Sequence, residues 1–395
     1  MDPSLQKEID QIIVEILPDL IAFRRETHRH PELGFQEYAT SERAKALLEK
    51  HGLRPTYVLE RTGLQCLIRG KKKGDSILLR GDMDCLPLQE EPGLPYCSEY
   101  PGRMHACGHD LNTTYAIGCA IVLNRLRSEL GGTVKVLLQP AEEGGGGAKC
   151  CIEKGVLDDI RPKYGFCLHT HPEHLLGHVG IRNGNATASA DTLTIRVKGK
   201  GGHAAYPHRT VDPVVISAHL ILALQTFVAR YHNPLNPLVI SMCTVQAGTT
   251  TNVTPDEVIM RGTVRSFDRD LRAKLPEQLS NLCRSTAEAF GGECEMEFGM
   301  GYPSIVVPPE LFEEGYHALV SALGEEHVDK TQLPTMGAED FGFFAEYFPC
   351  AQIRIGTQYD EPRSALPLHN PKILFSEESI PWGIRAGCAL AFGLC

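Results

Sequence analysis

The sequence predicts an α/β protein in which a smaller α+β domain is inserted into a larger domain. Three observations predict it. Short apolar strands alternate with helices up to residue 185, which is typical of a parallel sheet covered by helices. The pattern changes to a two-residue alternation near residue 186, and the first pattern returns after residue 301. We therefore expect residues 1–185 and 302–395 to form one discontinuous domain, and residues 186–301 to form the inserted one.

The larger domain is expected to carry polar residues at the ends of its strands. Its expected strands are 76–80, 133–138, 164–168 and 351–355; its expected helices lie between residues 5 and 50, at 111–130, from residue 309 and from residue 377. Ligands of such sheets bind beyond the carboxyl ends of parallel strands. The first three strands run into GDMD, QPAEE and His169, so we expect a site there.

The inserted domain is expected to be antiparallel. Residues 191–198, DTLTIRVK, alternate as a half-exposed strand does. Further strands are expected near 238–246, 257–267 and 293–298, with helices at 211–230 and near 269–290. This order predicts two helices packed on an antiparallel four-stranded sheet.

The composition excludes several classes of protein. The 395 residues are 42% hydrophobic and 22% charged, with a formal net charge of -10, which disfavours binding to nucleic acid or to an anionic membrane. No apolar run reaches the roughly 18 residues that span a bilayer. The N-terminal segment carries acidic residues and lacks a signal-peptide pattern. The fourteen scattered cysteines are then expected to be reduced thiols in a cytoplasmic protein.

The segment MHACGHD, residues 104–110, contains the most informative pair. Cys107 and His109 are two residues apart at the start of the long apolar helix. A thiolate and an imidazole suit zinc or a similar divalent ion. The alternative is a buried thiol beside a histidine that caps the helix.

The acidic pair of QPAEE can divide the labour of a hydrolytic metal site. Adjacent residues on an extended chain point in opposite directions, so Glu142 and Glu143 need not do the same work. One can bind a metal while the other takes a proton from the attacking water. Alone, such a pair before glycines is more often a solvated loop.

Other candidates follow further along the chain. His169 ends an apolar strand, and His369 lies between prolines that would hold it rigidly, whereas His171 and His174 are expected on the surface. Asp82 and Asp84 share a face, and one of them could accept the distal N–H of a histidine ligand. Five candidate ligands at the ends of one sheet are most simply explained by a dinuclear metal site: Cys107, His109, Glu143, His169 and His369.

The inserted domain adds three polar candidates. His203, in the glycine-rich segment GKGGHAAYPH, could donate a hydrogen bond to a developing oxyanion. Asn252 and Arg265 could bind a substrate carboxylate, because a guanidinium matches a carboxylate with two hydrogen bonds.

Six motifs in order resemble the M20 family of metallopeptidases, in its branch of N-acyl-amino-acid amidohydrolases, hippurate hydrolases and auxin-conjugate hydrolases. The resemblance runs from HRHPELG at 28–34 to His369 through RGDMDCLPL, MHACGHD, QPAEEGGGGA, GKGGHAAYPH, GAEDF and PLHNP. It implies a di-metal exopeptidase-like catalytic domain and an inserted α+β lid and dimerisation domain.

The resemblance also implies roles for individual residues. Cys107 matches the bridging ligand, and the remaining ligands match His109, Glu143, His169 and His369. Glu142 matches the general base and Asp84 the aspartate that orients a ligand. His203 matches a lid histidine that reaches the partner subunit's site, and Asn252 and Arg265 match lid positions that contact the substrate's carboxylate.

The expected reaction is hydrolysis of the amide bond of N-acyl-L-amino acids by a hydroxide held between two divalent ions, with Glu142 as base. Zinc is the favoured ion because thiolate is a soft ligand, while manganese, cobalt or nickel can serve such sites. The expected partners are a small-molecule substrate and a second copy of the chain. The alternatives are a dipeptidase or aminoacyl carboxypeptidase, a thiol hydrolase using Cys107, and a metal-dependent binding protein without catalysis.

The chain departs from other M20 branches at two positions that matter. Asp82 stands where many branches have a histidine ligand, and Cys107 where they have a bridging aspartate, which moves the histidine ligand to His109. Gly81 and Cys85 replace commoner alanines, and Phe343 follows GAEDFG; these changes bear on the acyl preference.

Overall fold

The computed structural model describes residues 1–91 and 93–395, which form two compact units. Unit 1 contains Met1–Ala186, Val306–Pro334 and Asp340–Cys395. Unit 2 contains Thr187–Ile305 and the short segment Thr335–Glu339, which the sequence pattern had placed with the larger domain. The protein is an α/β structure, as the sequence predicts.

Unit 1 is built on an eight-stranded sheet with the order β1-β2-β4-β3-β5-β16-β6-β15. Its strands are β1 (Thr56–Leu59), β2 (Thr62–Arg69), β3 (Ser76–Asp82), β4 (Thr133–Gln139), β5 (Tyr164–Leu175), β6 (Val179–Gly180), β15 (Val328–Asp329) and β16 (Cys350–Gln358). The central strands β4, β3, β5 and β16 are parallel, whereas β2 joins β4 and β6 joins β16 antiparallel. The sheet is therefore mixed, with the predicted parallel strands at its centre.

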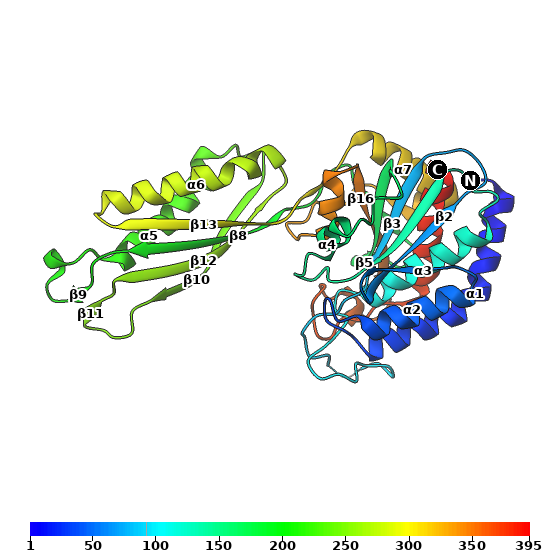
Figure 1. The fold of residues 1–395 in the computed structure, drawn as a ribbon, viewed down its shortest axis with the longest axis horizontal. Helices are drawn as coiled ribbons and strands as arrows, with labels where there is room; N and C mark the ends of the chain where they lie inside the picture. The colour runs from blue at the N-terminus through cyan, green and yellow to red at the C-terminus, as the bar shows by residue number, and fades with distance from the viewer. Residues whose placement is uncertain (92) are drawn as a thin grey trace. The chain divides into compact units, whose positions relative to one another are not determined.

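The helices of unit 1 pack on its sheet and position the ends of the central strands. They are α1 (Pro3–Arg29), α2 (Tyr38–Lys50), α3 (His109–Arg125), α4 (Gly147–Glu153), α7 (Pro309–Leu323) and α8 (Ile380–Leu394), with the short helices η3 (Glu325–His327), η4 (Asp340–Glu346), η5 (Pro362–Ala365) and η6 (Glu377–Ser379). Helix α3 is buried from His109 to Leu123 because the sheet, α1 and α8 all pack against it (Figure 1). A Cβ on Gly81 of β3 would lie 2.3 Å from the carbonyl oxygen of Asn112, so glycine there permits the close approach of α3.

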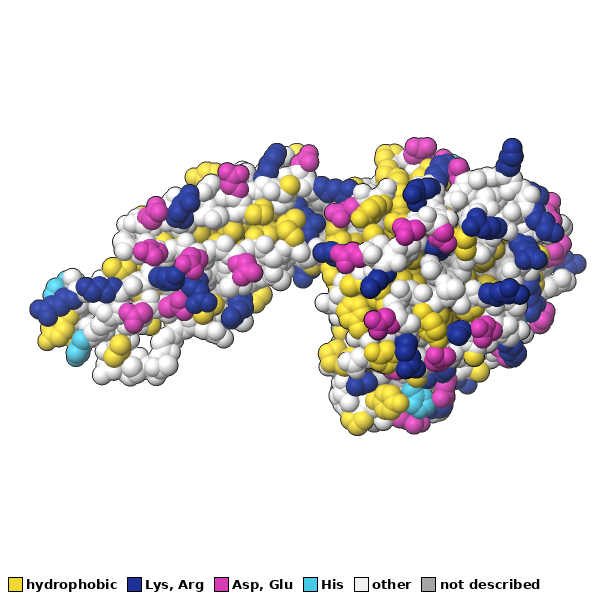
Figure 2. Space-filling view, in the orientation of Figure 1, with side chains coloured by type: hydrophobic (Ala, Val, Ile, Leu, Met, Phe, Trp, Pro, Cys, Tyr) yellow, Lys and Arg dark blue, Asp and Glu magenta, His cyan; other side chains and the backbone are white. Residues whose placement is uncertain are grey.

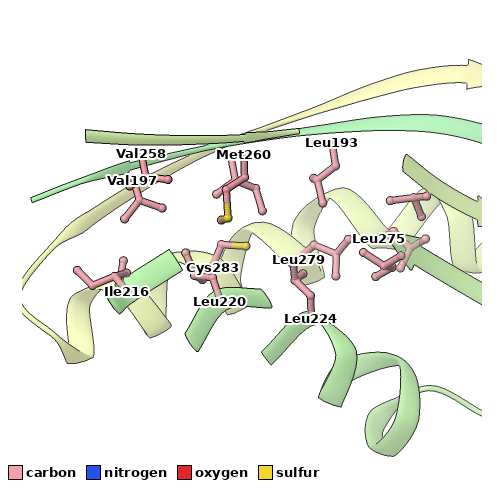
Figure 3. Close-up of a cluster of buried hydrophobic side chains, with 14 of the residues drawn as sticks. Leu193, Val197, Ile216, Leu220, Leu224, Val258, Met260, Leu275, Leu279 and Cys283 are labelled. Atoms are coloured by element: carbon pink, nitrogen blue, oxygen red, sulfur yellow. The ribbon is translucent and has the colours of Figure 1, made fainter. Parts of the chain in front are cut away.

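Unit 2 has the predicted two helices on a four-stranded antiparallel sheet of order β10-β12-β8-β13. Its elements are β8 (Ala190–Lys198), β9 (Gly202–His203), η1 (Pro207–Arg209), α5 (Pro213–Thr226), η2 (Phe227–Tyr231), β10 (Leu238–Ala247), β11 (Val253–Thr254), β12 (Glu257–Ser266), α6 (Arg269–Ala289) and β13 (Glu293–Tyr302). Apolar side chains of the strands, including Leu193 and Met260, face Leu220 and Leu279 of the two helices (Figure 3). Strands β7 (Gly184–Thr187) and β14 (Ile305–Val307) form a separate two-stranded sheet.

One helical stretch of the described chain, Pro213–Tyr231, is long and apolar enough by length and composition to cross a membrane. No such stretch is expected from the sequence alone. This stretch buries Ile216, Leu220 and Leu224 in the core of unit 2 while Leu222 is 64% exposed. On the visible face of both units, acidic and basic side chains are interspersed (Figure 2).

Candidate metal centre

The candidate ligands of unit 1 meet at the carboxyl ends of its central strands. Donor atoms of Cys107, His109 and His169 all lie within 4.8 Å of one another. A second group within the same limit contains Cys107, Glu143 and His369. Cys107 belongs to both of these groups, as a bridging ligand would, while His109 and Glu143 meet again in a group with Glu142, and His169 in a group with Asp82 and Glu339.

His109 is held so that one ring nitrogen is free. It begins α3 after Gly108, whose φ of 75° turns the chain into the helix. Its Nδ1 lies 2.9 Å from the carbonyl oxygen of Asp84 and 3.3 Å from Asp84 Oδ1. Its buried Nε2 has no hydrogen-bond partner among the described residues. This is the arrangement of a histidine whose second nitrogen binds a cation.

His169 also bonds a backbone carbonyl oxygen through Nδ1 and directs Nε2 to the candidate ligands. Its Nδ1 lies 2.7 Å from the carbonyl oxygen of Thr170, and its Nε2 lies 3.7 Å from Cys107 Sγ. The side chain of Asn112 in α3 accepts a hydrogen bond from the Thr170 amide at 2.8 Å, which fixes this end of β5 against the helix.

The loop after β4 presents Glu142 and Glu143. The carboxylate of Asp84 accepts hydrogen bonds from the backbone amides of Glu142 at 3.0 Å and Glu143 at 2.9 Å. Oε1 of Glu143 lies 3.9 Å from His109 Nε2 and 3.2 Å from His369 Nε2. Glu142 is also buried, and a carboxylate oxygen of it groups with donor atoms of His109 and Glu143.

His369 reaches this group from the other end of the chain. It has a positive φ of 66°, which is uncommon for a residue with a side chain and is typical of functional sites. Its amide donates a hydrogen bond to the carbonyl oxygen of Ala106 at 3.0 Å, beside Cys107. The ring is 53% exposed, so it forms the open side of the group.

The pKa shifts fit a site that holds a cation. Burial and the nearby Glu143 carboxylate raise the pKa of the Cys107 thiol well above its ordinary value. For Glu143, burial acts to raise the pKa, but the hydrogen bond from His369 and the charge of His109 outweigh it, and the pKa is lowered. The mixed set of sulfur, imidazole and carboxylate donors, with His109 Nε2 left without a hydrogen bond among the described residues, fits a divalent metal ion.

The structure also contains a buried network of ion pairs around Arg80, which was not predicted from the sequence. Arg80 pairs with Asp82 and with Asp340, 2.9 Å away, and all three side chains are fully buried. Asp340 also accepts hydrogen bonds from Gln139 and from the Ala148 amide. The signal for this network was Arg80, a charged residue inside an otherwise apolar strand. Asp82, which lies where other branches have a ligand, thus pairs with Arg80 and also lies 3.7 Å from His109 Nε2.

Three further candidates lie in unit 2 and not in unit 1, which holds the candidate ligands. His203 (β9), Asn252 (the loop before β11) and Arg265 (β12) all belong to unit 2, and the Ala204 amide donates to the carbonyl oxygen of Asn252 at 3.1 Å.

The expectation that His171 and His174 lie on the surface is wrong. Both are mostly buried with rings 5.2 Å apart, and burial, with Arg354 nearby, lowers the pKa of His171 to about 2.

Comparison with known proteins relates most of the chain to one family. Residues 78–392 match the profile described as Peptidase family M20/M25/M40. An N-acyl-L-amino acid amidohydrolase of Geobacillus stearothermophilus is 39% identical over 306 residues, covering 76% of this chain and 81% of that protein. Thermostable carboxypeptidase 1 of Saccharolobus solfataricus is 35% identical and covers 98% of each. The crystal structure of the YXEP protein of Bacillus subtilis, described as a dinuclear metal binding peptidase from the M20 family, covers 96% of this chain and 98% of that one, with a TM-score of 0.83 and 33% identity.

Proposed function

The chain belongs to peptidase family M20/M25/M40 and is a metal-dependent hydrolase, and we propose that its reaction is hydrolysis of the amide bond of N-acyl-L-amino acids. The products are a carboxylic acid and a free amino acid. The observation that carries this proposal is the placement of two adjacent carboxylates, Glu142 and Glu143, beside His109. One of them can bind a metal while the other remains available as a base.

We assign five residues as ligands of two divalent ions: Cys107, His109, Glu143, His169 and His369. Cys107 is the proposed bridge because it matches the bridging ligand of the family and lies within 4.8 Å of donor atoms of His109 and His169 and of Glu143 and His369. Bound there, the ions would supply a Lewis acid for the amide carbonyl and lower the pKa of the attacking water. Zinc is the proposed ion, since thiolate and imidazole are its usual ligands; manganese, cobalt or nickel remain alternatives.

The protein's own side chains carry the proton transfers in this proposal. Glu142 accepts a proton from the attacking water and then passes it to the departing amine. Asp84 keeps this geometry in two ways. It lies within hydrogen-bonding distance of His109 Nδ1, and its carboxylate accepts hydrogen bonds from the backbone amides of Glu142 and Glu143. His203 of unit 2 is the proposed donor to the developing oxyanion. Asn252 and Arg265 are the proposed contacts of the substrate carboxylate.

A homodimer formed through unit 2 completes the proposal. His203 would then act in the site of the partner subunit, as the resemblance to the family implies. Exposed apolar side chains on α5 support an interface on this unit. Val214 is 44% exposed, Val215 48% and Leu222 64%. We propose unit 2 as a lid and dimerisation domain on these grounds.

The second candidate function is that of a dipeptidase or aminoacyl carboxypeptidase. Thermostable carboxypeptidase 1, similar over almost the whole chain, favours it as the alternative. A thiol hydrolase is disfavoured, because the raised pKa of Cys107 leaves little thiolate in the absence of a cation.

The test is hydrolysis of a panel of N-acetyl-, N-benzoyl- and aminoacyl-amino acids, with and without chelator and with added zinc, manganese or cobalt. Release of free amino acid from the acyl substrates, lost with chelator and restored by metal, is the expected result. Preference for the aminoacyl substrates would favour the second candidate. Turnover that chelator does not change would contradict the metal-dependent mechanism and revive the thiol hydrolase.

A further inference from the structure

We propose that Glu37 is a positioning residue whose buried carboxyl group holds the loop that carries Glu142 and Glu143. The proposal rests on the proposed function, because it assigns Glu37 to the geometry of the proposed base. Glu37 comes just after the HRHPELG segment and contributes no candidate ligand or base. Its role follows from its hydrogen bond to Ala141 and from the backbone conformation and close packing of Ala141, the residue before Glu142.

The first contact is a hydrogen bond. The backbone amide of Ala141 donates to Oε1 of Glu37 at 2.8 Å, and Glu37 is fully buried. The next two amides of the loop, those of Glu142 and Glu143, donate to Asp84. Two buried carboxyl groups therefore fix three consecutive amides immediately before and at the acidic pair.

The second contact concerns the backbone of Ala141. Its φ is 56°, a left-handed conformation that alanine adopts at a cost and that surrounding contacts must impose. The carbonyl oxygen of Ala141 accepts the amide of Gly147 at 2.9 Å. With the amide held by Glu37, both polar groups of this residue are bonded. Loss of the Glu37 acceptor would leave a buried amide unsatisfied and remove a restraint on the strained residue.

The third contact is steric. A Cβ on Gly34 would lie 3.1 Å from the Cβ of Ala141, and one on Gly145 would lie 2.8 Å from it. The segment before α2 thus provides room for the methyl group of Ala141 and an acceptor for its amide. The hydrogen bond to Glu37 therefore restrains the chain at the residue directly before Glu142.

A purely structural role for Glu37, as the cap of α2, does not account for these contacts. Glu37 is the N-terminal cap residue of α2, but its side chain makes no capping hydrogen bond. The carboxylate of Glu32 accepts the amides of Ala39 at 3.1 Å and Thr40 at 2.7 Å and so caps the helix. The carboxyl group of Glu37 is left for the loop.

The protonation of Glu37 agrees with this role. Burial, together with the charge of Asp84, raises the pKa of Glu37 to about 8. At neutral pH the group is therefore mainly a neutral carboxylic acid, and the backbone amides of Ala141, Phe35 and Glu37 itself act on it. Glutamine reproduces this form, since its side-chain oxygen accepts in the same position. Methionine has a similar length and removes the acceptor.

The experiment compares four single variants, Glu37→Gln, Glu37→Met, Ala141→Gly and Glu32→Met, and the double variant that combines Glu37→Met with Ala141→Gly. Their kcat, KM, bound metal and amide exchange of the 139–146 peptide are measured by steady-state kinetics, elemental analysis and hydrogen-exchange mass spectrometry. Glu37→Met is expected to lower kcat roughly 10- to 100-fold, with KM and metal content near wild type and faster exchange of Ala141. Glu37→Gln is expected to retain wild-type behaviour.

The control variants separate positioning from folding. Ala141→Gly should restore most of the kcat lost in Glu37→Met, because glycine adopts a positive φ without the restraint. Glu32→Met removes the cap of the same helix and should lower stability while leaving kcat within about threefold. Wild-type kcat in Glu37→Met, no rescue by Ala141→Gly, or an equal loss in Glu32→Met would overturn the proposal.

Failure of this inference and failure of the proposed function give different results. If the wild-type protein hydrolyses no member of the panel, the proposed reaction is wrong, and the exchange measurement still decides the Glu37 contact. Faster exchange of Ala141 in Glu37→Met, but not in Glu37→Gln, supports the contact whatever the substrate; unchanged exchange refutes it.

Discussion

Nε2 of His369 lies 3.2 Å from Oε1 of Glu143, which brings the last polar motif of the chain to the loop after β4. The two residues belong to segments of unit 1 that are separated in the sequence by the whole of unit 2. Their proximity, with Cys107 in the same group of donor atoms, is the geometric basis for assigning both as ligands of one ion.

His369→Ala is expected to lower metal affinity at least about 10-fold, because it removes one of the donors of that group. The measurement is metal content by elemental analysis after dialysis against a graded series of chelator concentrations. His317, an exposed histidine of α7, provides the matched control as His317→Ala. Equal metal retention by both variants would remove His369 from the ligand set.

Glu142→Gln is expected to lower kcat by at least about 100-fold, since the amide cannot accept the proton of the attacking water. Metal content should stay at the wild-type level, because Glu142 is not among the proposed ligands. Both quantities are measured on the same protein preparation. Full activity of this variant would assign the base elsewhere, and loss of metal would make Glu142 a ligand.

His203→Ala is expected to lose roughly 100-fold in kcat with its metals in place. If His203 acts in the partner's site, mixing inactive His203→Ala with inactive Glu142→Gln and allowing subunits to exchange should restore about one quarter of wild-type activity, because half of the dimers are hybrids with one complete site. Activity is followed against time after mixing. Absence of recovery, with exchange shown by mass-tagged subunits, would place His203 outside a shared site.

Asp82→Asn is expected to lower the free energy of unfolding by about 3 kcal/mol, because it removes one of the carboxylates that pair with the buried Arg80. Burial acts to raise the pKa of Asp82, but His109 and Arg80 bring it down to about 2, so the group is charged in the native protein. Urea denaturation of the metal-free protein measures the change. A loss below about 1 kcal/mol would show that the ion pair contributes little.

Glu37 should make stability depend on pH in the opposite sense to a salt-bridged acid. Its pKa is raised from the ordinary value of 4.5 to about 8, so the folded state holds a proton that the unfolded state has released. Stability is then lost as pH rises from about 4.5 to 8 and is restored on acidification. Relative to Glu37→Gln, the metal-free wild type should lose on the order of 4 kcal/mol over this interval, measured by urea denaturation at each pH. A constant difference would show that Glu37 is ionised in the native protein.

The sequence predicted the fold class because the periodicity of its strands is local information. TVKVLL and YGFCL are short, mainly apolar runs, as buried central strands require, and they form β4 and the first part of β5. The hairpin of β1 and β2 was not predicted. Its burial depends on β4, a partner about 70 residues away, and periodicity does not report such a partner.

Glu143 and His169 were found because they follow predicted strands. His171 and His174 were misplaced because the end of one of these strands was predicted too early. The strand expected to end at Leu168 continues to Leu175, since β16 pairs with it as far as that residue. Residues assigned to a surface loop are therefore inside the sheet. Glu37 and Asp340 were missed because each acts on a loop distant in sequence, which the spacing of motifs does not reveal.

The place of β16 in the sheet has a consequence for the order in which the protein can mature. This strand, residues Cys350–Gln358, lies between β5 and β6 and is made only after the whole of unit 2. On a ribosome, a nascent chain that has already emerged through Gly180 must keep the edge of β5 unpaired while more than a hundred further residues are added. Unit 2 can form its own sheet and core during that wait, whereas completion of the larger sheet, and of the ligand set that ends with His369, is among the last events of synthesis.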